Sequence, residues 1–326
     1  MEVTGIPVTV LRPAAPGPRP VVVIAHGFAG SAVIMGALAE QVAKAGAIAV
    51  TFDFVGHGAN PAHMPGGGGM SEQGQAALQA DLETVLQWIA SQPDVNAEQI
   101  AVIGHSMGAG AVVRYAIAHP TSLRSVIAIS LPSATDIPRD DPTVPTNLLL
   151  LVGSAEPASF TSAALTGLQQ AYPSGVFGEV YGSAGNGSLR SAQVITGSEH
   201  IGIVFAPATS LAVTEWLART LVVEGTALQV PPAAPHTLVW LAMLLVAGVL
   251  LMVPLARLLY PHSSERQKVP VRWMAHTVVI VALAATVADL VAWSLQSFTA
   301  LLPLAVGGYL ASWFLAAGAA MLVLSL

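Results

Sequence analysis

A serine between two glycines, Ser106, is the residue of this sequence best placed to do chemistry. Residues 104–108 read Gly-His-Ser-Met-Gly; they follow the apolar, β-branched run Gln99–Ile103 and precede an expected helix over 107–118. At a strand-to-helix turn this pattern strains the backbone of the serine and projects its hydroxyl above the carboxyl edge of the sheet. The helix N-terminus adds free N–H groups and a positive dipole end, which suit a developing oxyanion. The pattern therefore predicts that Ser106 is a nucleophile for acyl transfer.

The sequence around this turn alternates short apolar runs with helical stretches. Six runs are expected to form strands: Pro20–Ala25, Ala47–Phe52, Gln99–Ile103, Ser125–Ile129, Asn147–Val152 and Ala192–Ile195. Helices are expected over 32–45, 72–91, 107–118, 158–171 and 205–221. Alternation of this kind is typical of an α/β fold with right-handed βαβ units and a doubly wound, mostly parallel sheet. A first strand, Val8–Arg12, has no helix behind it and is expected to pair antiparallel at the edge.

A second motif, after the strand Pro20–Ala25, is similar to a motif of a known family. Residues 26–30 read His-Gly-Phe-Ala-Gly and follow the strand Pro20–Ala25. With the serine turn, they resemble the HGxxG oxyanion loop of the α/β-hydrolase superfamily, in its serine-nucleophile esterase and lipase type. The resemblance implies that the backbone N–H groups of Phe28 and Met107 form an oxyanion hole. Two converging donors on neighbouring turns can reach one carbonyl oxygen, which agrees with that assignment.

The resemblance also implies a histidine base and a carboxylate, in the chain order nucleophile, acid, histidine. His200 follows the strand Ala192–Ile195 and precedes the last expected helix of this region, where the family keeps its base. His119 lies at the end of a helix, and the other histidines after Ser106 fall beyond residue 235. We therefore expect His200 to be the catalytic base.

Two carboxylates compete for the role of acid. Glu156 follows the strand Asn147–Val152, where the family usually carries an aspartate in a Gly-x-x-Asp pattern. Asp136 lies shortly after the strand Ser125–Ile129, at a site that some relatives use. Either group could orient the imidazole and stabilise its protonated form. We favour Glu156, and Asp136 stays open as the alternative.

Residues 53–58, Asp-Phe-Val-Gly-His-Gly, resemble the DxxGxG turn of the family, which is structural there. We therefore expect Asp53 and His57 to be turn residues with satisfied hydrogen bonds. Only residues 131–146 separate the strands Ser125–Ile129 and Asn147–Val152, which is too short for a helical cap. The substrate site is therefore expected to be open, which suits varied or bulky esters, or covered by the membrane part, which suits lipid-like ones.

These residues predict a membrane-anchored serine hydrolase that cleaves carboxylic esters through an acyl-enzyme intermediate. The expected substrate is a small-molecule or lipid-like acyl compound, and no metal or organic cofactor is implied. An acyltransferase or peptidase on the same fold is the alternative, as is a catalytically idle sensory module of a membrane protein. A net charge of −6 argues against nucleic acid as a partner.

The composition changes after residue 225. We expect a hydrolase domain over 1–225, a Pro-rich linker over 226–236 and a transmembrane region over 237–326. Hydrophobic residues make up 54% of the chain and charged ones 9%. Long uncharged stretches predict about three transmembrane helices, approximately 237–258, 274–296 and 302–325.

The basic residues near the predicted spans lie between Arg257 and Arg272. The positive-inside rule places this loop in the cytoplasm and the hydrolase domain on the extracytoplasmic face of the bilayer. The residues before the first strand do not resemble an export signal, so a cytoplasmic hydrolase domain stays open as the alternative. Asp289 is the only charged residue after Arg272. It is expected to lie near an interface or to pair with a polar group of another helix, because an unpaired carboxylate is costly at the centre of a bilayer.

Overall fold

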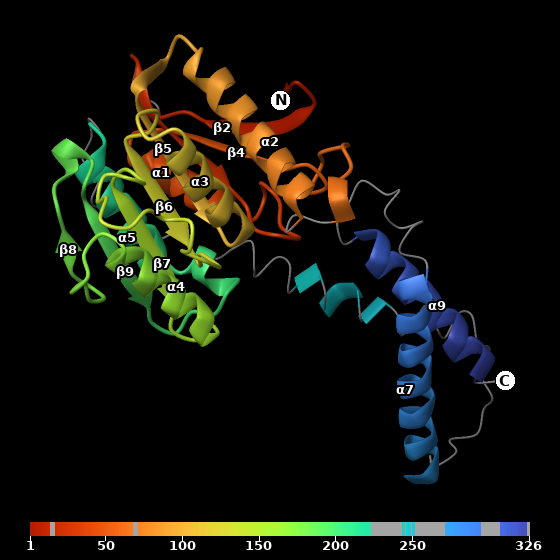
Figure 1. Ribbon diagram of the computed structural model, residues 1–326. Coiled ribbons are helices and arrows are strands. Elements are labelled where there is room, and N and C mark those ends of the chain that lie inside the picture. The colour runs from red at the N-terminus through yellow and green to blue at the C-terminus, as the bar shows by residue number, and fades with distance from the viewer. Residues whose placement is uncertain are drawn as a thin grey trace. The chain divides into compact units, whose positions relative to one another are not determined.

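The chain divides into two units, Met1–Pro235 and His236–Leu326 (Figure 1). The computed structural model describes residues 1–13, 17–67, 71–222, 271–294 and 307–324, together with short helical pieces between 243 and 251. Each unit is considered by itself below.

The first unit is built on a nine-stranded sheet with the strand order β1-β2-β4-β3-β5-β6-β7-β9-β8. The strands are β1 (Glu2–Val3), β2 (Ile6–Leu11), β3 (Arg19–Ala25), β4 (Ile48–Phe52), β5 (Val95–His105), β6 (Ser125–Ile129), β7 (Leu148–Gly153), β8 (Val180–Tyr181) and β9 (Arg190–Ile195). Six neighbouring strands run parallel to one another: β4, β3, β5, β6, β7 and β9. At one side β2 pairs antiparallel with β4 and β1 pairs antiparallel with β2, and at the other side β8 pairs antiparallel with β9. The six predicted parallel strands and the antiparallel first strand are therefore confirmed, while the two-residue strands β1 and β8 were not predicted.

Helices cover both faces of this sheet (Figure 1). The helices are α1 (Gly36–Lys44), α2 (Glu72–Ala90), α3 (Met107–Ala118), α4 (Ala158–Gln169) and α5 (Pro207–Thr220). Side chains of α2, α3 and α4 share one hydrophobic core with the sheet, and side chains of α1 and α5 share the other. The fold is thus the doubly wound α/β arrangement that the alternation predicted.

Strand β3 shows how the sequence produces the two layers. Val21 and Val23 point into the core with α2 and α3, whereas Val22 and Ile24 point into the core with α1 and α5. All four side chains are fully buried, and burial of each contributes about 1.5–3 kcal/mol. A strand with two buried faces needs apolar residues at every position, which is why β3 reads as a continuous apolar run.

The register of the parallel strands brings five loops to one edge of the sheet. Ala25 of β3 pairs with Gly104 of β5, and His105 pairs with Ile129 of β6. Gly153 of β7 pairs with Ile195 of β9. The loops that follow these strands therefore start side by side. The described residues between β6 and β7 contain no helix, which confirms that no helical cap is inserted there.

The second unit corrects one prediction. It contains α7 (Val271–Ser294) and α9 (Gly307–Leu324), at two of the three predicted spans. Among the described residues, no helix has both the length and the apolar character needed to cross a bilayer. The predicted transmembrane segment is therefore wrong, and so is the multi-pass membrane localisation with an extracytoplasmic hydrolase domain. The linker over 226–236 and most of the first predicted span, 237–258, lie outside the described residues.

The physical reason is that a low number of charged residues is not enough for a helix to span a bilayer, because the helix must also be long and apolar. A span needs about 20 consecutive apolar residues, or about 30 Å. The 18 residues of α9 rise only about 27 Å. In α7 the run between His276 and Asp289 is about 12 residues long, or about 18 Å.

Asp289 joins the two helices of this unit. Its Oδ1 accepts a hydrogen bond from Nε1 of Trp313, at 2.6 Å, so the bond runs from α9 to α7. Of the two alternatives expected for Asp289, the structure shows the pairing with a polar group of another helix.

Candidate active site

Ser106 lies at the tight turn between β5 and α3. Its φ of 53° and ψ of −115° lie in a region that residues with a side chain rarely occupy. The two flanking glycines make the turn possible: a Cβ on Gly104 would lie 2.2 Å from the carbonyl oxygen of Gly108, and a Cβ on Gly108 would lie 2.5 Å from that of His26. The predicted strained turn is therefore present, with Ser106 at the start of α3.

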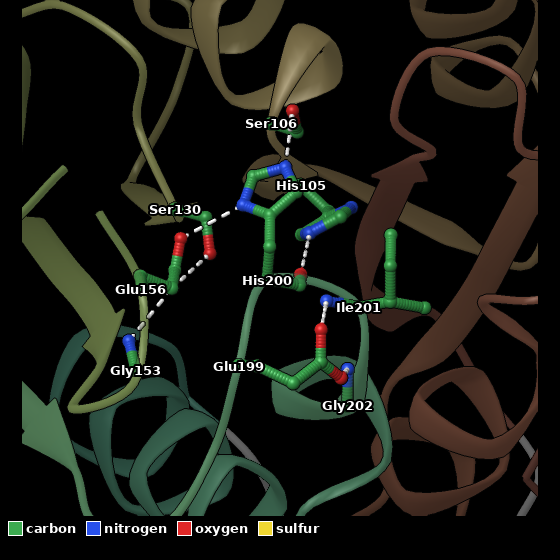
Figure 2. Close-up of polar contacts among 9 residues, drawn as sticks. All are labelled: His105, Ser106, Ser130, Gly153, Glu156, Glu199, His200, Ile201 and Gly202. Carbon is green, nitrogen blue, oxygen red and sulfur yellow. Dashed lines mark hydrogen bonds and ion pairs between the residues drawn. The ribbon is translucent and has the colours of Figure 1, made fainter.

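His200 lies in the loop after β9 and faces this serine (Figure 2). Its Nε2 is 2.9 Å from Oγ of Ser106. The imidazole packs between two other rings, with centroids 5.0 Å from His105 and 4.6 Å from Phe160. Its side chain is 29% exposed, so the hydrogen bond to Ser106 lies at the surface of the domain rather than inside its core.

Glu156 completes a hydrogen-bonded chain from the other side of the histidine. Its Oε2 is 2.8 Å from Nδ1 of His200, and its side chain is fully buried. Its Oε1 accepts hydrogen bonds from Oγ of Ser130 and from the backbone N–H of Gly153, each at 2.7 Å (Figure 2). Both partners are donors, so Oε1 acts as the acceptor of two hydrogen bonds that hold the carboxyl group in place. With Nδ1–H donating to Glu156, Nε2 of His200 is free to accept the proton of Ser106.

Asp136, the alternative acid, lies elsewhere. Its carboxylate is 3.7 Å from Nη1 of Arg114 and accepts a hydrogen bond from Thr135, and its side chain is 61% exposed. Since Nδ1 of His200 is already bonded to Glu156, the structure brings together Ser106, His200 and Glu156 and leaves Asp136 out.

The loops that carry Glu156 and His200 are bonded to each other. Ser154 N–H donates to the carbonyl of Ile195, and Ala155 N–H donates to that of Ser198, both at 3.0 Å. Gly153 permits this approach, because a Cβ there would lie 2.3 Å from the carbonyl oxygen of Ser198. The spacing between acid and base is therefore built into the backbone.

The adjacent Glu199 has a local role. Its carboxylate accepts hydrogen bonds from the backbone N–H groups of Ile201, at 2.9 Å, and Gly202 (Figure 2). It thus closes the turn that leads into the short helix Gly202–Phe205, and it does not contact the imidazole of His200.

The loop after β3 lies against the serine turn. A Cβ on Gly27 would be 3.2 Å from Cβ of Ser106, so the absence of a side chain allows close contact. Ala29 has a positive φ of 56°, and Gly30 N–H donates to the carbonyl of Gly27 at 3.0 Å. The N–H groups of Phe28 and Met107 have no hydrogen-bond partner within the described part of the chain. The two predicted oxyanion donors are therefore on adjoining loops and are not used by the fold itself.

The turn over 53–58 is held by its own hydrogen bonds. Oδ1 of Asp53 accepts from the N–H of Ala32 at 2.6 Å, and Oδ2 accepts from that of Ala59 at 2.9 Å. Nδ1 of His57 donates to the carbonyl of Val55 at 2.9 Å. The expected hydrogen bonds are therefore present at Asp53 and at Nδ1 of His57, whereas Nε2 of His57 is buried without a partner among the described residues.

His26 is buried beneath this turn. Its Nδ1–H donates to the carbonyl of Gly27 at 2.8 Å, and its Nε2 accepts from the N–H of Phe54 at 3.1 Å. Burial lowers the pKa of His26 to about 4, so the ring is neutral near pH 7. His26 therefore links the oxyanion loop to the turn over 53–58. Over the described ranges, no group of three or more His, Asp or Glu side chains is arranged to bind a metal ion.

Sequence reasoning missed two residues at this site, Ser130 and His105. Ser130 directly follows β6, has a positive φ of 54° and donates a hydrogen bond to Glu156. The signal was its position at the carboxyl end of a strand next to β7. His105 lies within the serine motif, at a position that the pattern leaves variable, so the motif carried no signal for it.

Comparison with known proteins agrees with this geometry. Residues 16–159 match a family of hydrolases described as serine aminopeptidase, S33. Over 67–68% of its length the chain superposes on Est1E from Butyrivibrio proteoclasticus with ferulic acid bound (16% identity, 98% of that chain, TM-score 0.51) and on a predicted CIB-like hydrolase from Thermoplasma acidophilum (15% identity, 95% of that chain, TM-score 0.51). The first unit therefore has the α/β-hydrolase fold.

An uncharacterized protein of Mycobacterium tuberculosis is also similar to part of this chain. The two are 33% identical over 126 residues, which are 36% of this chain. The aligned part spans only 42% of the length of that relative. The family match and the serine-hydrolase type of α/β fold together support a hydrolase.

Proposed function

We propose that this α/β-hydrolase is a serine hydrolase that cleaves carboxylic esters with Ser106, His200 and Glu156. The observation that carries the proposal is the unbroken chain of hydrogen bonds from Ser106 Oγ through the His200 imidazole to Glu156, with bonds of 2.9 and 2.8 Å. It joins a partly exposed hydroxyl on a strained turn to an imidazole and a buried carboxyl group. This is the arrangement that nucleophilic catalysis by a serine requires.

In the acylation step, Oγ of Ser106 attacks the carbonyl carbon of the ester while its proton moves to Nε2 of His200. Glu156 stabilises the imidazolium that forms. The negative charge on the carbonyl oxygen is held by the N–H groups of Phe28 and Met107, which the fold leaves without other partners. When the tetrahedral intermediate collapses, the carbon–oxygen bond to the alcohol breaks and the alcohol takes its proton from His200.

Deacylation reverses these roles. A water molecule gives a proton to Nε2 of His200 and attacks the acyl carbon, and the ester bond to Ser106 breaks. Ser106 recovers its proton from His200, and the carboxylic acid leaves. The steps need only the three side chains, the two backbone N–H groups and water.

The site favours a small-molecule ester. The segment between β6 and β7 contains no helical cap. Phe28, on the loop that lies against the serine turn, is 51% exposed. Phe160 lies next to His200. Apolar and aromatic surface at the reacting atoms suits an uncharged acyl or alcohol group.

A peptidase is the second candidate, because the matching family is described as serine aminopeptidase. The same three residues would cleave an amide by the same two steps. An aminopeptidase must also recognise the free amino group of its substrate, which esters of simple carboxylic acids lack. Substrates that differ only in this feature therefore separate the two candidates.

The test uses the purified full chain with a fluorophosphonate probe, followed by p-nitrophenyl esters of increasing acyl length and by aminoacyl p-nitroanilides. We expect one labelled residue, Ser106, and turnover of the esters. The control is Ser106→Ala, which removes one hydroxyl and should abolish labelling and reduce kcat by at least about 10³-fold. Wild-type turnover by Ser106→Ala would overturn the proposal, and anilide cleavage without ester cleavage would favour the peptidase.

A further inference from the structure

His105 occupies the variable position of the serine motif, and nothing in the motif requires a histidine there. The turn needs the glycines at 104 and 108 and the serine, for the steric reasons given above. His105 is nevertheless buried, with 5% of its surface exposed, at the last position of β5. A buried polar side chain that the turn does not need indicates a separate role.

The imidazole of His105 is bonded to the loop that carries the proposed base. Its Nε2 is 2.8 Å from the backbone carbonyl oxygen of His200 (Figure 2). Because a carbonyl only accepts, the proton of His105 must lie on Nε2. Burial lowers the pKa of His105 to about 4, so near pH 7 the ring is neutral and this N–H is its only one.

The same ring contacts two further parts of the site. It packs against the imidazole of His200, with ring centroids 5.0 Å apart. Its Nδ1 faces Gly27 of the oxyanion loop, where a Cβ would lie 2.8 Å away. His105 therefore touches the loops of the base and of the oxyanion donors, and its own backbone adjoins Ser106.

The loop that carries His200, here called the base loop, makes its other hydrogen bonds to the loop of Glu156 or within itself. Ser198 is held by Ala155 N–H, and Glu199 bonds within its own loop. Those bonds set the distance between Glu156 and the loop, whereas the bond from His105 sets its distance from the serine turn. A displacement of about 1 Å in a catalytic group can reduce the rate by about 100-fold.

We propose that His105 is a positioning residue for the hydrolysis. Through its N–H bond to the carbonyl of His200, it holds the base loop at the distance from β5 at which Nε2 of His200 meets Oγ of Ser106. The role rests on the proposed function, because positioning a base matters only where the base acts.

The test compares His105→Gln with His105→Asn. The amide nitrogen of Gln extends about as far as Nε2 and can donate to the same carbonyl, whereas that of Asn is too short. We expect His105→Asn to lower kcat by about 10- to 100-fold with little change in KM, and His105→Gln to retain most of the activity. His119→Gln, at the exposed end of α3, is the matched control and should have wild-type kcat.

A readout without substrate separates this proposal from the proposed function. The proton shared by Nδ1 of His200 and Glu156 should give a downfield NMR resonance in the wild type and in His105→Gln. The resonance should broaden or disappear in His105→Asn, at equal thermal stability of the two variants. Equal kcat and equal resonances in Asn and Gln variants would overturn the positioning role, even if esters are cleaved. A wild type that shows the resonance but cleaves no ester would overturn the proposed function alone.

Discussion

Two clusters of histidine and carboxylate lie at the same edge of the sheet, and their hydrogen bonds differ. In the serine cluster (Ser106, His200, Glu156), the carboxylate bonds to an imidazole, and the imidazole bonds to a hydroxyl. In the turn cluster (His26, Asp53, His57), the histidines bond to backbone groups, and both carboxylate oxygens of Asp53 accept from backbone N–H groups. The residue types alone do not distinguish the proposed reactive site from a structural turn. The hydrogen-bond partners distinguish them, because the serine cluster bonds side chain to side chain and the turn cluster bonds side chain to backbone.

Burial reinforces this difference. The side chain of His200 is 29% exposed, whereas His26 is fully buried and His57 is 2% exposed. Burial lowers the pKa of both histidines of the turn cluster, His26 and His57. Both rings are therefore neutral near pH 7 and take no part in proton transfer. A base must exchange its proton with substrate and water, so only the exposed histidine suits that role.

The largest expected effect comes from breaking the serine cluster at its buried end. In Glu156→Gln, an amide N–H2 can face Nδ1 of His200 and turn it into an acceptor, which leaves Nε2 protonated and unable to take the proton of Ser106. We expect kcat for ester hydrolysis to fall by about 10³- to 10⁴-fold. Steady-state kinetics measure it, and Asp136→Asn is the control and should change kcat by less than about threefold. The opposite ranking of the two variants would assign the acid to Asp136.

The corresponding change in the turn cluster should affect stability instead of rate. In Asp53→Asn, one of the N–H groups of Ala32 and Ala59 loses its acceptor and faces another donor. We expect the free energy of unfolding to fall by about 1–3 kcal/mol, while kcat per folded molecule stays close to wild type. Denaturant unfolding and active-site titration with fluorophosphonate measure the two quantities separately. A large fall in kcat at unchanged stability would show that the clusters are coupled.

A pH effect should come from Asp81 on α2, which adjoins the turn cluster. Its Oδ2 accepts from the N–H of Val55 at 2.7 Å, and burial raises its pKa to about 6. The folded state therefore binds a proton more tightly than the unfolded state, so this group makes the protein less stable as pH rises from about 4 to 6. Asp81→Asn keeps an acceptor for Val55 and cannot ionise. We expect it to raise the free energy of unfolding at pH 7 by about 1–2 kcal/mol, and to have little effect at pH 4.

The smallest expected effect on kcat comes from removing one of the hydrogen bonds that hold Glu156. Ser130→Ala removes one of the two donors to Oε1 of Glu156 and leaves the N–H of Gly153 in place. We expect kcat to fall by about 3- to 10-fold, or about 0.7–1.4 kcal/mol, which is the typical net contribution of one hydrogen bond. Ser133→Ala, in the exposed loop that follows, provides the control. If Ser130→Ala is as slow as Glu156→Gln, the orientation of Glu156 depends on Ser130 rather than on Gly153.

Most of the fold could be predicted from the sequence, because local patterns determine it. A strand with two buried faces needs an unbroken apolar run, and a helix needs a longer, periodic one. The parallel strands and the helices from β3 to α5 therefore follow from patterning alone, whereas the two-residue strand β8 does not. The strain at Ser106 could also be predicted, since flanking glycines are needed wherever a turn is this tight. The C-terminal unit shows the limit of such reasoning: a shortage of charge indicated spans, but continuous apolar length is what a bilayer requires, and no described helix has it.

The sequence by itself determined the parallel sheet, the serine turn and the two carboxylates from which the acid had to come. Only the tertiary structure decided between them, because the distance from His200 to Glu156 or Asp136 depends on how the loops after β6, β7 and β9 bond to one another. The same holds for Ser130 and His105, whose partners are 26 and 95 residues away along the chain. No local pattern records such a contact. The parallel register creates it, by bringing the ends of distant strands to one edge.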